Sequence, residues 1–208
     1  MQRRVRSALA DAKITLDAST SFSSPTPITA DIIDNIPYLH AFCLEVLRLH
    51  CPVTLTLRIT SRDTTIQGHL IPKDTTVVLG ISALNQDKSL WGADASEFNP
   101  DRWLSLTSVT DPETGEEMKV EKVNASGGAS SNYAFLTFLH GPRSCIGSNF
   151  ARAEFAMLIA AWVAAFETEL ADEEEKAKFE LGKKIEIQGG ITARPKGGVR
   201  VKVTPVES

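Results

Sequence analysis

The chain has 208 residues, 42% hydrophobic and 23% charged, which is the composition of an ordinary globular protein and excludes a disordered one. A net charge of -4 gives no reason to expect a nucleic-acid partner, and 3 cysteines argue against a disulfide framework. The longest apolar run, 156–166, is shorter than the about 20 residues that cross a bilayer. We therefore expect a soluble, cytoplasmic chain with neither a signal peptide nor a membrane anchor.

The first half of the chain predicts helices followed by short strands. Apolar residues at helical spacing, ended by Pro or by Ser- and Thr-rich loops, predict three helices: residues 1–12, 30–35 and 37–51. Alternation of apolar and polar residues then predicts three strands and, after them, a short helix: residues 54–60, 64–67, 75–79 and 81–87. Pro37 suits the first position of its helix, because the missing N–H has no partner there anyway.

The second half contains the strongest helix pattern. Residues 104–133 are first charged and then rich in Gly, Ser and Ala, so we expect little order there and a surface insertion. Residues 148–169 are apolar around most of a helical circumference, which predicts a deeply buried helix. Residues 184–187 and 199–203 alternate around glycines and predict a terminal β-hairpin. The fold class is α+β, mainly α.

Cys145 stands apart from Cys43 and Cys51, which lie among apolar residues and are expected to be packing residues. It lies in a glycine-punctuated turn before the long helix, where backbone N–H groups favour a thiolate. A nucleophile would need a base, and His140, although near in sequence, has no assignable Asn or Asp partner. A purely structural role for Cys145 leaves the neighbouring glycines unexplained.

A third interpretation makes Cys145 a ligand of heme iron and uses every residue of the turn. Gly141 and Gly147 would let the backbone approach a flat macrocycle closely. Phe138 can shield the sulfur from water, and Arg143 can neutralise a heme propionate. A thiolate ligand pushes electron density onto iron and favours O–O cleavage.

Residues 138–147 fit the pattern F-x-x-G-x-R-x-C-x-G, which resembles the ligand loop of the cytochrome P-450 heme-thiolate monooxygenases, here of a fungal-like type. The resemblance implies heme as the cofactor and Cys145 as its axial iron ligand. One departure is Leu139, where the family usually carries a small or polar residue.

The resemblance extends upstream. Residues 45–48 resemble the family's E-x-x-R helix and residues 98–103 its proline-arginine loop, so that Glu45, Arg48 and Arg102 are expected to form a buried charge network. The resemblance also implies a second propionate-binding residue, Arg58. It further implies substrate-contacting residues at Val53, Thr54, Leu55 and Ile191.

By this resemblance, residues 1–208 form only the C-terminal part of the family domain. The pattern A/G-G-x-D/E-T-T of the oxygen-activating distal helix is not found, so the catalytic residues stay unknown. A complete member is expected on the cytosolic face of the endoplasmic reticulum membrane. There it would insert one oxygen atom of O2 into a small lipophilic substrate, with electrons from an NADPH-dependent reductase. The 208 residues alone are expected to be inactive; the alternative is a non-catalytic heme-binding remnant or half of a split protein.

Overall fold

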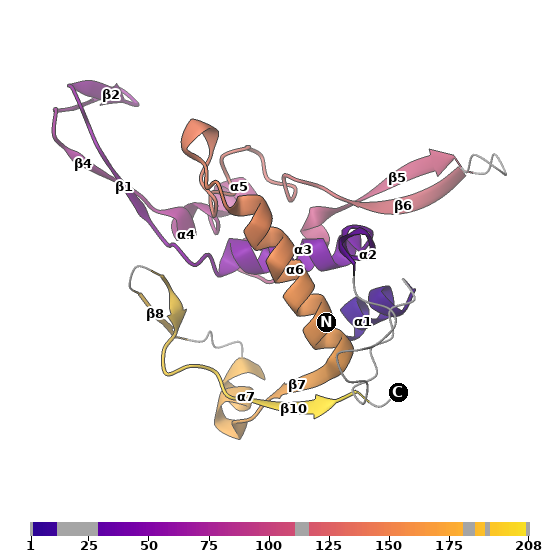
Figure 1. Cartoon of the computed structure of the whole chain (residues 1–208). Coiled ribbons are helices and arrows are strands. Elements are labelled where there is room, and N and C mark those ends of the chain that lie inside the picture. The colour runs from indigo at the N-terminus through magenta and orange to yellow at the C-terminus, as the bar shows by residue number, and fades with distance from the viewer. Residues whose placement is uncertain (1, 12–28, 111–116, 181–185, 190–191, 207–208) are drawn as a thin grey trace.

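Two crossing helices form the centre of the molecule. The computed structural model describes residues 2–11, 29–110, 117–180, 186–189 and 192–206. Helix α3 (Pro37–Leu49) is crossed by α6 (Ser148–Ala165), and both are contacted by α1 (Gln2–Asp11) and α2 (Ala30–Asp34), as Figure 1 shows. Pro37 occupies the start of α3, as predicted. The three helices expected in the first part of the chain are therefore confirmed.

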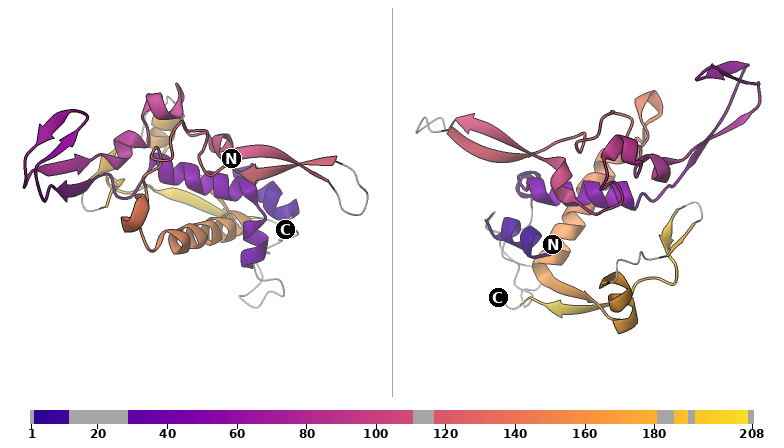
Figure 2. Two further views of the ribbon diagram at one scale, coloured as in Figure 1. Left: turned by 90° about the horizontal axis from the view of Figure 1, so that it is seen from above. Right: turned by 180° about the vertical axis from the view of Figure 1, so that it is seen from behind.

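The described residues contain ten strands, arranged as five antiparallel two-stranded sheets. The pairs are β1 (Thr56–Ile59) with β4 (Thr76–Leu79), β2 (Thr64–Ile66) with β3 (His69–Ile71), β5 (Leu104–Thr110) with β6 (Glu117–Val123), β7 (Phe166–Leu170) with β10 (Val201–Pro205), and β8 (Ile187–Gln188) with β9 (Arg194–Pro195). The β1–β4 arm and the β5–β6 hairpin project from the helices in opposite directions in every view (Figure 2).

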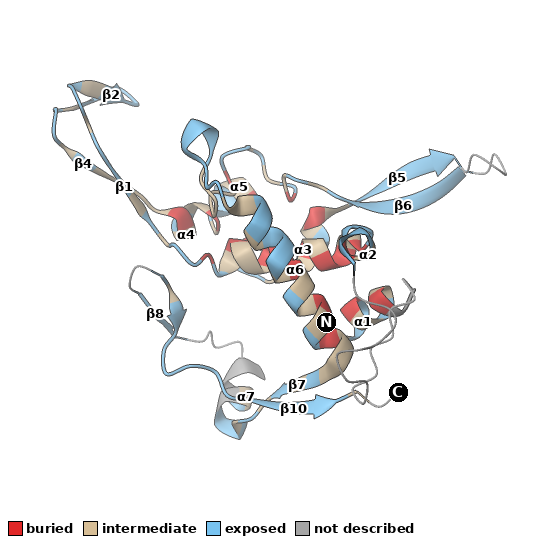
Figure 3. Cartoon of the chain, in the orientation of Figure 1, coloured by how far each residue is buried: buried red, intermediate tan, exposed pale blue. Residues whose placement is uncertain are grey.

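Short helical segments complete the chain between these elements: α4 (Ile81–Leu84), α5 (Lys88–Trp91), η1 (Pro100–Trp103), η2 (Gly141–Arg143) and α7 (Glu173–Glu180). The buried residues gather around α3 and form two clusters (Figure 3). One cluster joins α3 to α1, α2 and α6 through residues such as Leu9 and Leu39. The other joins α3 to α5, η1 and the stretch before η2 through Trp91, Trp103 and Ala134.

The prediction of deep burial for the long helix is wrong. The α-helix ends at Ala165, and the residues after it form β7. Only Ala156, Ala160 and Val163 of α6 are buried, a narrow stripe of small residues that contacts the other helices. Phe150 is 72% exposed and Leu158 is 61% exposed. The apolar character of the sequence thus did not decide which faces are covered.

The predicted terminal hairpin is also wrong in its pairing. Val201 of β10 pairs with Leu170 of β7, whereas Ile187 of β8 pairs with Pro195 of β9. The strand that directly follows α6 offers a free edge, and the last strand adds to it. Residues 184–185 of the predicted hairpin lie outside the described residues.

Residues 104–110 and 117–123 are more ordered than their composition predicted. They form a hairpin of two paired seven-residue strands, in register from Leu104 opposite Val123 to Thr110 opposite Glu117. Nearly all of their side chains are exposed, which explains a polar and charged sequence in a regular structure. That residues 104–133 are an insertion stays a prediction.

Candidate functional site

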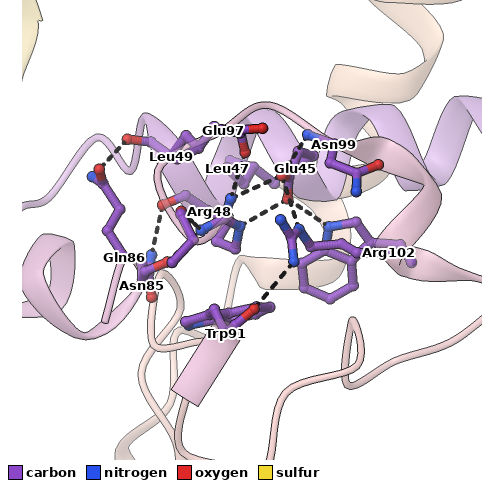
Figure 4. Close-up of polar contacts among 12 residues, drawn as sticks. Glu45, Leu47, Arg48, Leu49, Asn85, Gln86, Trp91, Glu97, Asn99 and Arg102 are labelled. Carbon is purple, nitrogen blue, oxygen red and sulfur yellow. Dashed lines mark hydrogen bonds and ion pairs between the residues drawn. The ribbon is translucent and has the colours of Figure 1, made fainter. Parts of the chain in front are cut away.

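The buried centre of the site is the carboxylate of Glu45, whose side chain has 0% exposure. Arg48, three residues later on the same face of α3, donates to both carboxylate oxygens, Nε to Oε2 and Nη2 to Oε1, each at 2.8 Å (Figure 4). Arg102 donates from Nε to Oε1 at 3.1 Å. The structure thus brings together the three side chains that the sequence pattern placed in one network.

Two further groups complete the shell of Glu45. The indole N–H of Trp103 donates to Oε2 at 2.9 Å, and the backbone N–H of Asn99 donates to Oε1 at 2.9 Å. Both come from η1 and the residue before it, where Pro100 starts a tight 3-10 turn. The proline-containing turn therefore aims one backbone and two side-chain donors at a single carboxylate.

Arg48 uses its remaining donors on backbone carbonyls. Its Nη1 donates to the oxygens of Asn85 (2.7 Å) and Ala95 (2.6 Å), and its Nη2 donates to that of Glu97 (3.1 Å). The guanidinium is fully buried and also lies over the Trp91 ring, 5.0 Å from its centroid. A buried guanidinium is tolerated when its N–H groups all have hydrogen-bond partners and its charge is paired, whereas an unpaired buried cation strongly destabilises the fold.

The pKa of Glu45 reports the balance of these effects. Burial by itself raises the pKa of this carboxyl, but the hydrogen bonds from Arg48, Asn99 and Trp103 and the positive charge of Arg48 lower it below its ordinary value. The carboxylate is therefore ionised at neutral pH. In contrast, burial without such partners raises the pKa of Cys43 to about 12, so that thiol stays protonated.

The loop that carries Cys145 is short and shaped by unusual backbone angles. Leu139 has a φ of 60° and Gly141 a φ of +79°, so the chain turns sharply on both sides of His140. The η2 turn follows, and the N–H of Cys145 donates to the carbonyl of Phe138 at 2.8 Å, which closes the loop. A left-handed leucine costs about 1–2 kcal/mol, a strain of the kind found at ligand-binding sites.

Cys145 is exposed, unlike the buried Cys43 and Cys51, whose expected packing role is thereby confirmed. Its neighbour Ile146 is 104% exposed, and α6 begins three residues after the cysteine. A Cβ at Gly141 would meet no atom within 4 Å, and one at Gly147 would stand 3.9 Å from the Cys145 sulfur. Glycine at both positions keeps the backbone beside the thiol free of side chains.

Two arginines lie near the loop in the sequence and in space. Arg143 is exposed, and no hydrogen bond or ion pair joins its guanidinium to another described residue. Arg152, on the first turns of α6, lies over the ring of Phe138, 5.0 Å from its centroid, and over that of Phe135, 5.8 Å away. Phe138 is thus half-buried under Arg152 at the base of the loop.

The other predicted residues that the structure describes belong to a different part of the chain, between α3 and β1 and in β1 itself. Arg58, in β1 of the projecting arm, donates to the Thr56 hydroxyl and to the Leu57 carbonyl. Val53, Thr54 and Leu55 lie between α3 and β1, with Val53 41% and Leu55 49% exposed. In the described part of the chain, no hydrogen bond joins any of these residues to the cysteine loop. Ile191 lies outside the described residues.

Sequence reasoning missed Asn85 and Trp103 as members of the site. Both are fully buried, and Asn85 joins the Arg48 backbone to the stretch before the cysteine loop. A polar Asn directly after the short helical segment 81–84 was the available signal for Asn85. For Trp103 no such signal existed, because a buried tryptophan is ordinarily a packing residue.

The chemistry of this donor set fits an iron porphyrin. Among the described residues no group of three or more His, Cys, Asp or Glu side chains could hold a metal ion by itself. A single exposed thiol with glycines beside it, and with Arg143 free to meet a carboxylate, would suit iron that a porphyrin brings with it. The residues that would hold the group are Cys145, Phe138, Gly141, Arg143 and Gly147.

Comparison with known proteins identifies relatives along nearly the whole chain. The family model described as Cytochrome P450 matches residues 11–197. Cytochrome P450 monooxygenase sphH of Aspergillus fumigatus is 47% identical over 184 residues, which are 88% of this chain and 30% of that protein. Cytochrome P450 monooxygenase FUM15 of Gibberella moniliformis is 42% identical over 187 residues, 82% of this chain and 31% of that protein.

The fold agrees with these sequence relatives. A solved structure, retinoic acid bound cyanobacterial CYP120A1, superposes with a TM-score of 0.72 at 25% identity, covering 99% of this chain and 38% of that one. This chain spans 30% and 31% of the two fungal relatives. No helix among the described residues has the length and apolar character needed to cross a membrane. The chain belongs to the cytochrome P450 family.

Proposed function

We propose that this chain is the heme-thiolate part of a P450 monooxygenase that inserts one oxygen atom of O2 into a small lipophilic substrate. The observation that carries the proposal is the exposed Cys145 thiol in a strained, glycine-lined loop that is closed by the hydrogen bond to Phe138. When bound, heme supplies the oxygen-activating redox chemistry of the family. Electrons would come from an NADPH-dependent reductase.

Each residue of the loop has a stated task in this proposal. Cys145 would bind the heme iron through its thiolate, and Phe138, held under Arg152, would shield the sulfur from water. Gly141 and Gly147 leave room for the macrocycle. Arg143 neutralises one propionate, because its guanidinium has no carboxylate partner among the described residues. Arg58 is proposed as the second propionate partner and would have to exchange its local bonds to Thr56 and Leu57 for it.

The residues proposed to contact the substrate are those that the family resemblance implies, and two of them, Val53 and Leu55, have exposed apolar side chains. Val53, Thr54 and Leu55, together with Ile191, would contact a lipophilic substrate. The proposal places the complete enzyme on the cytosolic face of the endoplasmic reticulum membrane. Oxygen insertion is proposed to require the part of the relatives' length that this chain does not span, so the 208 residues alone bind heme weakly and do not turn over substrate.

A second candidate function is a non-catalytic heme-binding remnant or one part of a split protein. One observation favours it: the exposed apolar side chains of α6, Phe150, Leu158 and Trp162. The transcript upstream of the Met1 codon separates the two candidates. An in-frame segment that contains the distal-helix pattern A/G-G-x-D/E-T-T supports the enzyme. An in-frame stop codon directly upstream supports the remnant.

The direct test is heme uptake by the purified 208-residue chain. The chain is titrated with ferric heme, reduced and exposed to carbon monoxide, and its absorption spectrum is recorded. We expect a thiolate-type band that is lost in Cys145→Ala and kept in Cys51→Ala, the matched control for a cysteine away from the loop. A chain that takes up no heme, or a Cys145→Ala variant with an unchanged band, contradicts the proposal.

A further inference from the structure

The stretch immediately before the cysteine loop is attached to α3 by the Thr137 hydroxyl, which donates to the Leu47 carbonyl, and by the buried side chain of Asn85. Its Oδ1 accepts the N–H of Leu136 at 3.0 Å, and its Nδ2 donates to the Thr137 hydroxyl at 2.8 Å and to the Arg48 carbonyl at 3.1 Å. Asn85 is fully buried. An amide with its three partners satisfied in a dry environment fixes the position of each of them.

The orientation of this amide is determined by its partners. Leu136 offers an N–H, which requires the amide oxygen opposite it, while the Arg48 carbonyl requires the amide nitrogen. The reversed orientation would place two donors together at Leu136 and two carbonyls together at Arg48. Asn85 is therefore a directional connection, which a side chain with only donors or only acceptors cannot replace.

The backbone of Asn85 is itself held by the buried charge network. Its carbonyl accepts Arg48 Nη1 at 2.7 Å, so that Arg48 contacts Asn85 through both its side chain and its backbone. Figure 4 shows Asn85 beside Arg48, with Glu45 and Arg102 beyond it. Displacement of Arg48 would therefore displace Asn85.

On the other side, Thr137 extends the connection toward Cys145. The Thr137 hydroxyl accepts from Asn85 and donates to the Leu47 carbonyl of α3 at 2.8 Å. Phe138 follows directly, and its carbonyl accepts the N–H of Cys145 at 2.8 Å. Hydrogen bonds thus run from Glu45 through Arg48 and Asn85 to Thr137, and the peptide bond from Thr137 to Phe138 joins them to the backbone that closes the loop.

We infer that Asn85 is the positioning residue through which the buried Glu45–Arg48–Arg102 network sets the place of the Cys145 sulfur, with Thr137 as its partner. The inference deepens the proposed function, because it concerns the residue proposed as the iron ligand. It separates two roles for the network: support of the fold, which any buried ion pair could give, and placement of the loop, which depends on Asn85.

The first test uses the heme-free chain, so that it does not depend on cofactor binding. Backbone amide hydrogen exchange is compared in Asn85→Ala, Thr137→Val and the wild type, with Gln86→Ala as the control. Gln86 is the adjacent residue and bonds to Leu49 and Ser82 but not to the loop. Thr137→Ser keeps the hydroxyl and serves as the rescue variant for Thr137→Val.

We expect the Leu136 and Cys145 amides to exchange about tenfold faster in Asn85→Ala, the ratio that loss of about one net hydrogen bond produces. In Thr137→Val the Cys145 amide should exchange faster, and in Thr137→Ser and Gln86→Ala both amides should exchange at the wild-type rate. Thr137→Val keeps the shape of the side chain, so it gives a result even where Asn85→Ala does not fold. Unchanged Cys145 exchange in both variants overturns the inference, as does an equal increase in Gln86→Ala.

The second test adds heme and measures the thiolate-type fraction of the reduced carbon-monoxide spectrum. This fraction should fall in Asn85→Ala and Thr137→Val and stay unchanged in Thr137→Ser and Gln86→Ala. A wild type without the thiolate band but with the expected exchange rates would refute the proposed function and support the placement role. A band lost in Cys145→Ala but unchanged in Asn85→Ala would support the proposed function and refute the placement role.

Discussion

The replacement Glu45→Gln tests the claim that the buried network stabilises the fold. Glu45 accepts five hydrogen bonds, two from Arg48 and one each from Asn99, Arg102 and Trp103. Glutamine keeps the size but removes the negative charge and replaces one acceptor oxygen by an NH2 group that would face N–H donors. The buried Arg48 guanidinium, with 0% exposure, is then left without a counter-charge.

Breaking a buried ion pair from one side costs about 3–5 kcal/mol, because the remaining charge stays desolvated. Total stabilities of domains are only about 5–15 kcal/mol, so this loss is a large part of the whole. Urea denaturation followed by circular dichroism should give a much lower midpoint for Glu45→Gln at an unchanged slope.

The matched control is Lys196→Gln, which removes an ion pair with Glu186 whose side chains are 67% and 75% exposed. Its midpoint should equal that of the wild type, because exposed pairs are solvated and screened. A cost of less than about 1 kcal/mol for Glu45→Gln, as expected for a surface pair, would refute the assignment of the network as a buried and stabilising one.

Two further predictions concern the same buried region. Gly127→Ala should lower the free energy of unfolding by about 2–5 kcal/mol, and Gly128→Ala by about 1–2 kcal/mol. Both glycines have a positive φ, but only a Cβ at Gly127 meets the Trp103 ring, at 2.9 Å. Equal denaturation midpoints for the two variants would contradict this prediction. The lowered pKa of Glu45 means that its contribution to stability is fully present above the ordinary glutamate pKa and is lost as the pH falls through the lower pKa of the folded state. As the pH is lowered from about 4, the melting temperature of the wild type should therefore fall more steeply than that of Glu45→Gln. Parallel curves of melting temperature against pH for the two proteins would count against this prediction.

Local patterns were enough wherever the relevant partners lie close in the sequence. The 3-residue spacing of Glu45 and Arg48 determines that they share a helix face, and Pro37 and Pro52 set where α3 begins and the point that it cannot pass. The glycines and the cysteine of residues 141–147 define a loop beside a helix start for the same reason. The family assignment rests on these local patterns and their order along the chain.

Apart from the contact between Arg102 and Glu45, which the family resemblance predicted, only the tertiary structure decided which distant groups meet. The donation from Trp103 to Glu45 spans 58 positions and that from Leu136 to Asn85 spans 51, and no periodicity encodes such contacts. Strand β10 pairs with β7 instead of forming the predicted hairpin, because a free strand edge accepts any extended segment that can reach it. The apolar residues of α6 are exposed for a related reason. The hydrophobicity of a side chain sets the free energy that it gains by burial, but the neighbouring elements determine whether that side chain is covered.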